Sequence, residues 1–127
     1  MSTAATNKKV IAITGASSGI GKETAKQLVN NGFNVALLAR SKDKLRSMVE
    51  ELGNDNAFAV KADVSDFKDV DTAFEKVSKH FGRIDGIFAN AGRGAKAAGI
   101  EKGDVDDWDG MLGANVNGLL YTAKAGL

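Results

Sequence analysis

The stretch V-I-A-I-T-G-A-S-S-G-I-G at residues 10–21 constrains the fold of this chain more than any other. Its first four residues are apolar and mostly β-branched, which is typical of a buried parallel strand. Glycines follow at positions 15, 19 and 21, and a helical pattern begins there. Such a turn lets the backbone approach a ligand closely, and the helix start directs unpaired N–H groups toward it. The stretch predicts a pyrophosphate cradle; the alternative is a turn that only packs helix on strand.

Strands and helices alternate along the rest of the chain. The sequence predicts a helix over 20–31, strands over 33–39, 57–62 and 84–89, and helices that begin at Ser41, at Ser65 or Asp66, and near Asp104. This alternation indicates βαβ units and a parallel sheet with right-handed crossovers. We expect an α/β fold, a Rossmann-like three-layer sandwich whose sheet has about four strands in the order 3-2-1-4, with helices on both faces.

Two of the predicted helices carry apolar stripes. Helical spacing joins Phe67, Val70, Phe74, Val77 and Phe81 in the third helix, and Val105, Trp108, Leu112, Val116, Leu119 and Ala123 in the last one. The third strand is polar enough to lie at a sheet edge. More sheet would ordinarily follow the fourth strand and the last helix, so the sequence looks like a truncated domain with one edge and one helix face uncovered.

Composition excludes several classes of function. Lys plus Arg number 17 and Asp plus Glu 16, so a nucleic acid or an anionic membrane surface is not expected as the main partner. There is no cysteine, and the single histidine, expected at the surface, excludes a multi-histidine metal site; we expect no metal. No apolar run approaches the ~20 residues of a membrane span. Residues 1–9 lack the apolar core of a secretory signal, so we expect a cytoplasmic protein.

Four motifs in order resemble one enzyme family. They are T-G-A-S-S-G-I-G at 14–21, Asp63-Val64 after the third strand, Asn90-Ala91-Gly92 after the fourth, and Asn115 within A-N-V-N-G. Together they resemble the short-chain dehydrogenase/reductase family over essentially the whole chain. The resemblance implies that residues 1–127 are the N-terminal part of an NAD(P)-binding Rossmann domain.

The resemblance also implies site residues. Those for the cofactor are Gly15, Ser17, Ser18, Gly19, Ile20, Gly21, Arg40, Asp63, Val64, Asn90, Ala91 and Gly92, and the catalytic one is Asn115, in the helix lining the active site. Each polar match has a plainer alternative. Asp63 can be a turn residue, Asn90 a strand terminator, and Asn115 a tolerated polar residue within a helix.

The residue after the second predicted strand bears on the choice of cofactor. An Asp or Glu there would accept the ribose 2′-hydroxyl of NAD and repel a 2′-phosphate. Here the position holds Arg40, whose planar guanidinium suits a phosphate, followed by Ser41 and Lys42. The resemblance therefore implies NADP(H) rather than NAD(H), against the alternative of a solvent-exposed arginine at a strand end.

The catalytic residues of the family beyond Asn115 are not matched. The family uses a Ser and a Tyr-x-x-x-Lys motif, whereas Tyr121 and Lys124 are one residue too close together. The resemblance implies hydride transfer between NADP(H) and a small alcohol or carbonyl substrate, with this chain inactive alone because no acid–base group is positioned. The alternative is a non-catalytic dinucleotide-binding or interaction module. Self-association and pairing with a complementing C-terminal half are both expected forms of partnership.

Overall fold

The sheet has the strand order that the sequence predicts. The structure, a computed structural model, describes residues 6–126; residues 1–5 and residue 127, where the predicted last helix ends, lie outside the described part. The strands are β1 (Val10–Thr14), β2 (Asn34–Ala39), β3 (Ala57–Lys61) and β4 (Gly86–Ala89). All neighbouring strands are parallel, in the order β3-β2-β1-β4, so β3 lies at an edge as predicted.

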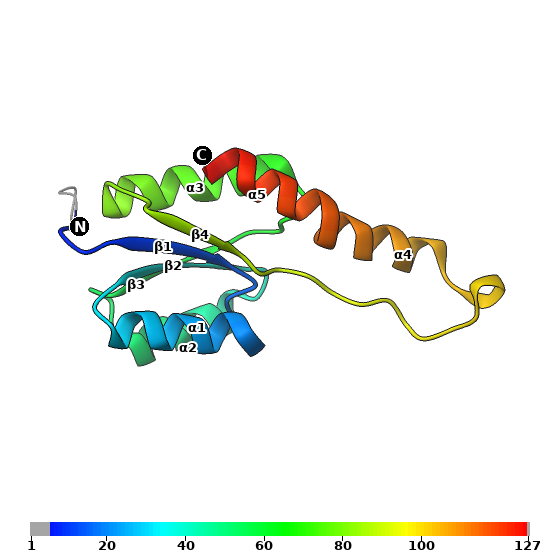
Figure 1. The fold of residues 1–127 in the computed structure, drawn as a ribbon, viewed down its shortest axis with the longest axis horizontal. Coiled ribbons are helices and arrows are strands. Elements are labelled where there is room, and N and C mark those ends of the chain that lie inside the picture. The colour runs from blue at the N-terminus through cyan, green and yellow to red at the C-terminus, as the bar shows by residue number, and fades with distance from the viewer. Residues whose placement is uncertain (1–5, 127) are drawn as a thin grey trace.

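Helices cover both faces of this sheet and make three layers (Figure 1). On one face lie α1 (Gly19–Asn30) and α2 (Lys42–Leu52), and on the other lie α3 (Phe67–Phe81) and α5 (Gly118–Gly126). A short η1 (Ile100–Lys102) and α4 (Val105–Leu112) follow β4, and the π-helical η2 (Gly113–Asn117) joins α4 to α5. The predicted three-layer arrangement is confirmed.

The core has two halves, one on each side of the sheet. All six residues of β2 are buried because this strand is central and covered on both faces. The face under α3 packs Ala36 and Leu38 against Val70, Phe74 and Val77, three members of the predicted stripe of α3. The opposite face packs Ile13, Val35, Leu37, Leu45 and Met48 among others.

The helix ends follow the predicted signals. Ser41 caps α2 by accepting a hydrogen bond from the Lys44 N–H, and Asp66, rather than Ser65, caps α3. Gly82 ends α3 in the left-handed conformation, with φ of 76°. His80 corrects one expectation, because its ring is half-buried and stacks on Phe58 with 4.0 Å between ring centroids.

The last helical region differs from the single amphipathic helix that we predicted. It is divided by η2, and members of its apolar stripe are about half exposed or more, including Val105, Leu112 and Leu119 at 60, 51 and 50%. Small residues face the protein instead: a Cβ on Gly118 would lie 2.7 Å from Val64 Cγ2. Close approach of the backbone of α5 therefore decides which face is buried.

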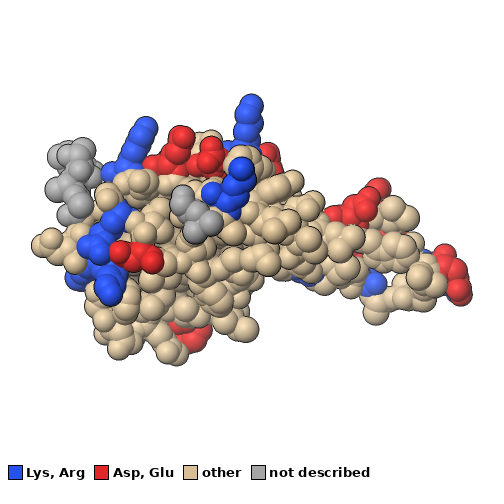
Figure 2. Space-filling model, turned by 45° about the horizontal axis from the view of Figure 1, so that its top comes forward, with Lys and Arg blue, Asp and Glu red and all other residues tan. Residues whose placement is uncertain are grey.

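The segment after β4 extends away from the sheet and returns as α4 (Figure 1). Lys and Arg are interspersed with Asp and Glu on the face in view in Figure 2, in keeping with the small net charge of +1. Within residues 6–126 no helix has the length and apolarity needed to cross a membrane.

Candidate dinucleotide-binding site

The turn between β1 and α1 favours glycine at positions 15, 19 and 21, for different reasons. Gly15 and Gly19 have positive φ, 64° and 57°. A Cβ on Gly15 would lie 2.8 Å from Ala91 Cα, and a Cβ on Gly21 would collide with the Gly15 carbonyl oxygen. Around the Cβ position of Gly19 nothing lies within 4 Å. The turn is therefore packed tightly on its inner side, whereas the backbone at Gly19 faces open space where a ligand can approach.

The N-terminus of α1 is built differently from those of the other long helices. Side chains of Ser41, Asp66 and Asp104 cap α2, α3 and α4. Ser18, at the same position of α1, makes no side-chain capping bond, and the first turn of α1 holds no acidic residue. The first N–H groups and the positive dipole end of α1 are thus left for an anion, which fits the phosphates of a dinucleotide.

Thr14 and Asn90 join the glycine turn to the end of β4. Thr14 Oγ1 is buried and accepts hydrogen bonds from the N–H groups of Asn90 and Ala91, both at 3.1 Å. Asn90 Nδ2 donates to the Gly15 carbonyl at 3.3 Å. The two motifs are 75 residues apart in sequence, yet their side chains and backbone form one support beneath the turn.

Asp63 follows β3 and is held by its own loop. Its Oδ1 accepts from the N–H of Ser65 at 3.0 Å and from Ser65 Oγ at 2.6 Å, and its N–H donates to Asp69 Oδ2 at 2.7 Å. The Ser65 hydroxyl does most to lower the pKa of the Asp63 carboxyl, and the positive charge of Arg40 lowers it further. The motif identified Asp63 but not Asp69, whose only sequence signal is its place in the first turn of α3.

One cavity of about 600 Å³ collects most of the predicted cofactor residues at the carboxyl ends of the strands. Its volume is within the range of ligand pockets, and its position is the one at which α/β sheets bind ligands. Of the predicted residues, those that line it are Gly15, Ser17, Ser18, Arg40, Asp63, Val64, Ala91 and Gly92. The sequence did not single out Lys44, Gly110 and Ala114, which also line it. We call it the dinucleotide cavity.

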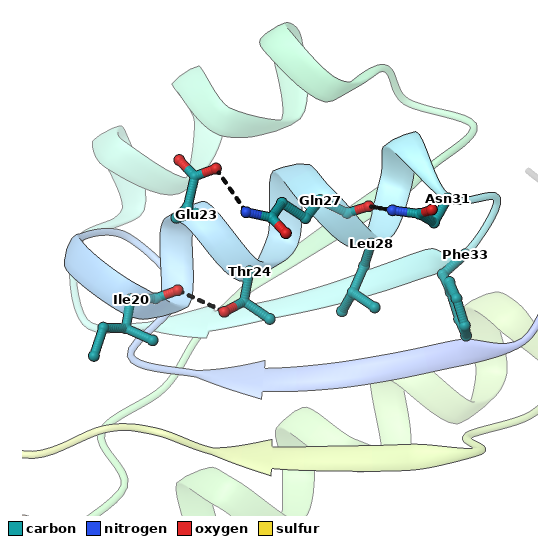
Figure 3. Close-up of a pocket in the computed structure, with 7 residues that line it drawn as sticks. All are labelled: Ile20, Glu23, Thr24, Gln27, Leu28, Asn31 and Phe33. Atoms are coloured by element: carbon teal, nitrogen blue, oxygen red, sulfur yellow. Dashed lines mark hydrogen bonds between the residues drawn. The ribbon is translucent and has the colours of Figure 1, made fainter.

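Five predicted site residues do not line the dinucleotide cavity: Gly19, Ile20, Gly21, Asn90 and Asn115. Ile20 points elsewhere: its side chain is 70% exposed and lies over a hollow of about 510 Å³ along the outer side of α1 (Figure 3). The polar groups of that hollow are used locally, since Thr24 Oγ1 donates to the Ile20 carbonyl and Asn31 Nδ2 donates to the Gln27 carbonyl. No polar groups converge there on a ligand.

Asn115 lies in η2 and holds the segment that leaves β4. Its Oδ1 accepts from the Arg93 N–H and its Nδ2 donates to the Arg93 carbonyl, both at 2.8 Å. The Arg93 guanidinium bonds Asp107 of α4, and the Lys96 N–H donates to Asp107 Oδ2 at 2.7 Å. The bond from Lys96 is the main reason that the pKa of Asp107 is lowered. Asn115 thus acts here on the backbone, with its amide oxygen and its amide nitrogen each making one hydrogen bond.

Tyr121 and Lys124 are packing residues. The Tyr121 ring meets Phe67 edge-on, with 5.7 Å between centroids, and Lys124 Nζ lies 5.9 Å from the centroid of the same ring. Neither lines the dinucleotide cavity. No group of three or more potential metal-ligating side chains occurs among residues 6–126.

Comparison with known proteins agrees with this geometry. The family model described as short chain dehydrogenase matches residues 9–127. The chain belongs to the short-chain dehydrogenase family. This short-chain dehydrogenase chain is 41% identical over 119 residues to an uncharacterized oxidoreductase of Staphylococcus haemolyticus, a match covering 94% of the chain and 51% of that relative.

Solved structures show the same fold. A 3-ketoacyl-(acyl-carrier-protein) reductase from Brucella melitensis complexed with NADH superposes with a TM-score of 0.87 at 37% identity, over 91% of this chain and 47% of that one. An alcohol dehydrogenase from Thermococcus sibiricus complexed with 5-hydroxy-NADP has a TM-score of 0.87 at 36% identity, over 94% and 52%. The chain therefore spans about half the length of the relatives it matches.

Proposed function

We propose that this chain is the cofactor-binding part of an NADP(H)-dependent oxidoreductase acting on a small alcohol or carbonyl substrate. The observation that carries the proposal is the uncapped N-terminus of α1, which meets the glycine turn beside the dinucleotide cavity. By contrast, α2, α3 and α4 are each capped by a side chain at this position. The anion that completes α1 is proposed to be the cofactor pyrophosphate. When bound, the cofactor supplies or accepts hydride.

Arg40 supports NADP(H) over NAD(H). It is exposed at the end of β2, lines the dinucleotide cavity, and has Ser41 beside it at the start of α2. A guanidinium at this place attracts a 2′-phosphate, whereas NAD-specific sites place a carboxylate there. The neighbours include complexes with NADH and with an NADP derivative, so proteins of this fold bind either cofactor. We propose that Arg40 makes the choice in this chain.

The adenosine and the rest of the dinucleotide are proposed to be held by Asp63, Val64, Ala91 and Gly92. These residues line the same cavity on its β3 and β4 sides. Asn90 and Asn115 are proposed to support it from behind, through Gly15 and through the Arg93 backbone. The proposed catalytic part of Asn115 is to fix the helix beside the reacting groups.

Catalysis requires a positioned proton donor, which is worth roughly 10²–10⁴ in rate. Tyr121, the one tyrosine of the chain, packs on Phe67 instead. We therefore propose that these residues bind cofactor without turning it over, and that the acid–base groups come from a C-terminal half such as the relatives have. A dinucleotide-binding module without catalysis is the second candidate, and the same position of Tyr121 favours it.

Titration of NADPH and NADH tests the cofactor proposal. We expect NADPH to bind at least about 10-fold more tightly, because a charge-assisted phosphate contact is worth about 1.5–3 kcal/mol. Arg40→Asp should abolish or reverse this preference. Arg46→Asp, on the exposed side of α2 and outside the dinucleotide cavity, is the matched control and should leave it unchanged. Equal affinity of the unmodified protein for both cofactors would refute the proposal.

An activity measurement separates the two candidate functions. NADPH oxidation is followed with a panel of small ketones and aldehydes, using the chain alone and the chain mixed with a separately produced C-terminal half of a relative. Turnover that appears only on mixing supports the enzyme. Cofactor binding without turnover in either sample supports the module.

A further inference from the structure

Lys44 lies where two hollows of the surface meet. It lines the dinucleotide cavity together with Arg40 and Ser41. It also lines an adjoining hollow of about 400 Å³ that contains Ser17, Ser18 and Lys22, which we call the serine hollow. Ser17, Ser18 and Lys44 are the residues that the two share. Lys44 therefore lies between the glycine turn and the residues that follow β2.

The charge of Arg40 is already partly balanced. Asp63 lines the same cavity, and the positive charge of Arg40 is one of the causes that lower the pKa of its carboxyl. A phosphate monoester carries about −1.5 to −2 charges at pH 7. A single guanidinium that also faces a carboxylate leaves much of that negative charge uncompensated, so a second cation is needed for strong discrimination.

The glycine turn does not provide this second cation. Its residues at this edge of the cavity are Ser17 and Ser18, whose side chains carry no charge. Lys22 lines the serine hollow but not the dinucleotide cavity. The remaining charged residue of the serine hollow is Glu51, and its carboxylate is paired with Lys26 at 3.1 Å. Lys44 takes part in no ion pair within the described residues.

We infer that Lys44 is a second cationic contact for the cofactor 2′-phosphate and, with Arg40, determines specificity for NADP(H). The inference rests on the proposed function. Lys44 is exposed on the first turn of α2 and lines the cavity, so its flexible side chain can extend toward an anion bound there. The backbone N–H of Lys44 donates a hydrogen bond to the Ser41 side chain at 3.4 Å. This bond fixes the backbone from which the Lys44 side chain extends, close to Arg40.

The same helix turn offers a matched control. Lys42 is also exposed and lies two residues before Lys44, so the two side chains point in different directions from the helix. Lys42 lines a groove with Phe58 and Lys61 beside β3 and does not line the dinucleotide cavity. Neutralising Lys42 or Lys44 removes one positive charge at nearly the same place in the sequence. Only Lys44 lines the dinucleotide cavity, so a difference between the two variants reports on the cavity.

The experiment compares Lys44→Gln, Lys42→Gln and Lys44→Arg with the unmodified protein. Dissociation constants are measured for NADPH, NADH, 2′,5′-ADP and 5′-AMP, at low and physiological salt. We expect Lys44→Gln to weaken NADPH and 2′,5′-ADP by about 10-fold, the low end of a charge-assisted contact because the site is exposed, and NADH and 5′-AMP by less than about 2-fold. Lys42→Gln should change each by less than about 2-fold, and Lys44→Arg should retain the preference.

Three outcomes overturn the inference: an unchanged NADPH affinity in Lys44→Gln, an equal loss for NADH, or an equal loss in Lys42→Gln, which would indicate a general electrostatic effect. Circular dichroism of each variant establishes that it is folded. Failure of the proposed function has a different signature, because the unmodified protein would then not distinguish NADPH from NADH. If it does, and Arg40→Asp removes the preference while Lys44→Gln does not, only the role of Lys44 is refuted.

Discussion

The side chain of Asn115 is hydrogen-bonded to both backbone groups of Arg93, as acceptor from the N–H and as donor to the carbonyl, each at 2.8 Å. This pair fastens the segment that leaves β4 to the π-helical turn before α5. The Arg93 guanidinium adds a second attachment, to Asp107. Gly110 leaves room for this guanidinium, which would have to shift if the residue carried a Cβ. The wall of the dinucleotide cavity after β4 is built from these contacts.

Asn115→Ala should lower the free energy of unfolding by about 1–2 kcal/mol, since two exposed hydrogen bonds are lost. It should also increase hydrogen exchange at the Arg93 amide, which the asparagine oxygen protects. Urea denaturation and exchange mass spectrometry measure the two effects. Asn117→Ala, at an exposed position in the same turn, is the control. Equal destabilisation by both variants would contradict the role assigned to Asn115.

Thr14→Val should destabilise the fold by about 1–3 kcal/mol, the cost of leaving one partly buried donor without an acceptor. The substitution keeps the shape of the side chain but leaves the Ala91 N–H without its acceptor, whereas the Asn90 N–H retains its bond to the Phe88 carbonyl. Thr14→Ser should recover most of the loss. Thr24→Val, on the outer side of α1, removes only a hydroxyl that donates to the Ile20 carbonyl and should be nearly neutral in the same urea titrations. A Thr14→Val protein as stable as Thr24→Val would disprove the bridge.

Gly19→Ala should separate stability from binding. Gly19 and Gly32 both have positive φ, 57° and 88°, and a Cβ on either would have no neighbour within 4 Å. Alanine at each position should therefore cost about 1 kcal/mol of stability through backbone strain. Only Gly19 lies at the start of α1, so only Gly19→Ala should weaken NADPH binding, by more than about 10-fold. Calorimetric titration of the two variants decides, and equal affinities would exclude the glycine turn as the phosphate site.

His80 should make stability depend on pH near neutrality. Burial lowers the pKa of its imidazole from the ordinary value of 6.5, so the unfolded chain takes up a proton at a higher pH than the folded protein does. The stabilisation is complete above about pH 6.5 and is lost as the pH falls from there through the folded-state pKa.

The chain has one histidine, so the effect can be assigned. In His80→Phe, which keeps an aromatic ring on Phe58, the urea midpoint should change less between pH 7.5 and pH 5 than in the unmodified protein. A slope that survives the substitution would place its origin elsewhere.

Local sequence signals determined the four strands, the first three helices and their order. The apolar runs, the cap at Ser41 and the stop at Gly82 were sufficient to predict these elements. Each of these signals acts on backbone only a few residues away in the sequence. Alternation of strands and helices then left few topologies, and the observed order β3-β2-β1-β4 is the one predicted. The motifs at 14–21, 63–64 and 90–92 each contribute residues to the dinucleotide cavity, because the carboxyl ends of parallel strands lie at one edge of the sheet.

Tertiary structure alone decided which face of a helix is buried and which side chains share a cavity. The stripe of the last helix has the right period but lies outward, because Gly118 lets α5 approach the sheet through its small residues. Lys44 was not selected by any motif, since what matters about it is its distance from Arg40 and Ser17 in space. Asn115 was found by its motif, but only the folded chain shows that its amide binds the Arg93 backbone. The periodicity of apolar residues determines which side chains share one face of a helix or strand. Which of these faces is buried depends on how closely two elements approach each other in the fold.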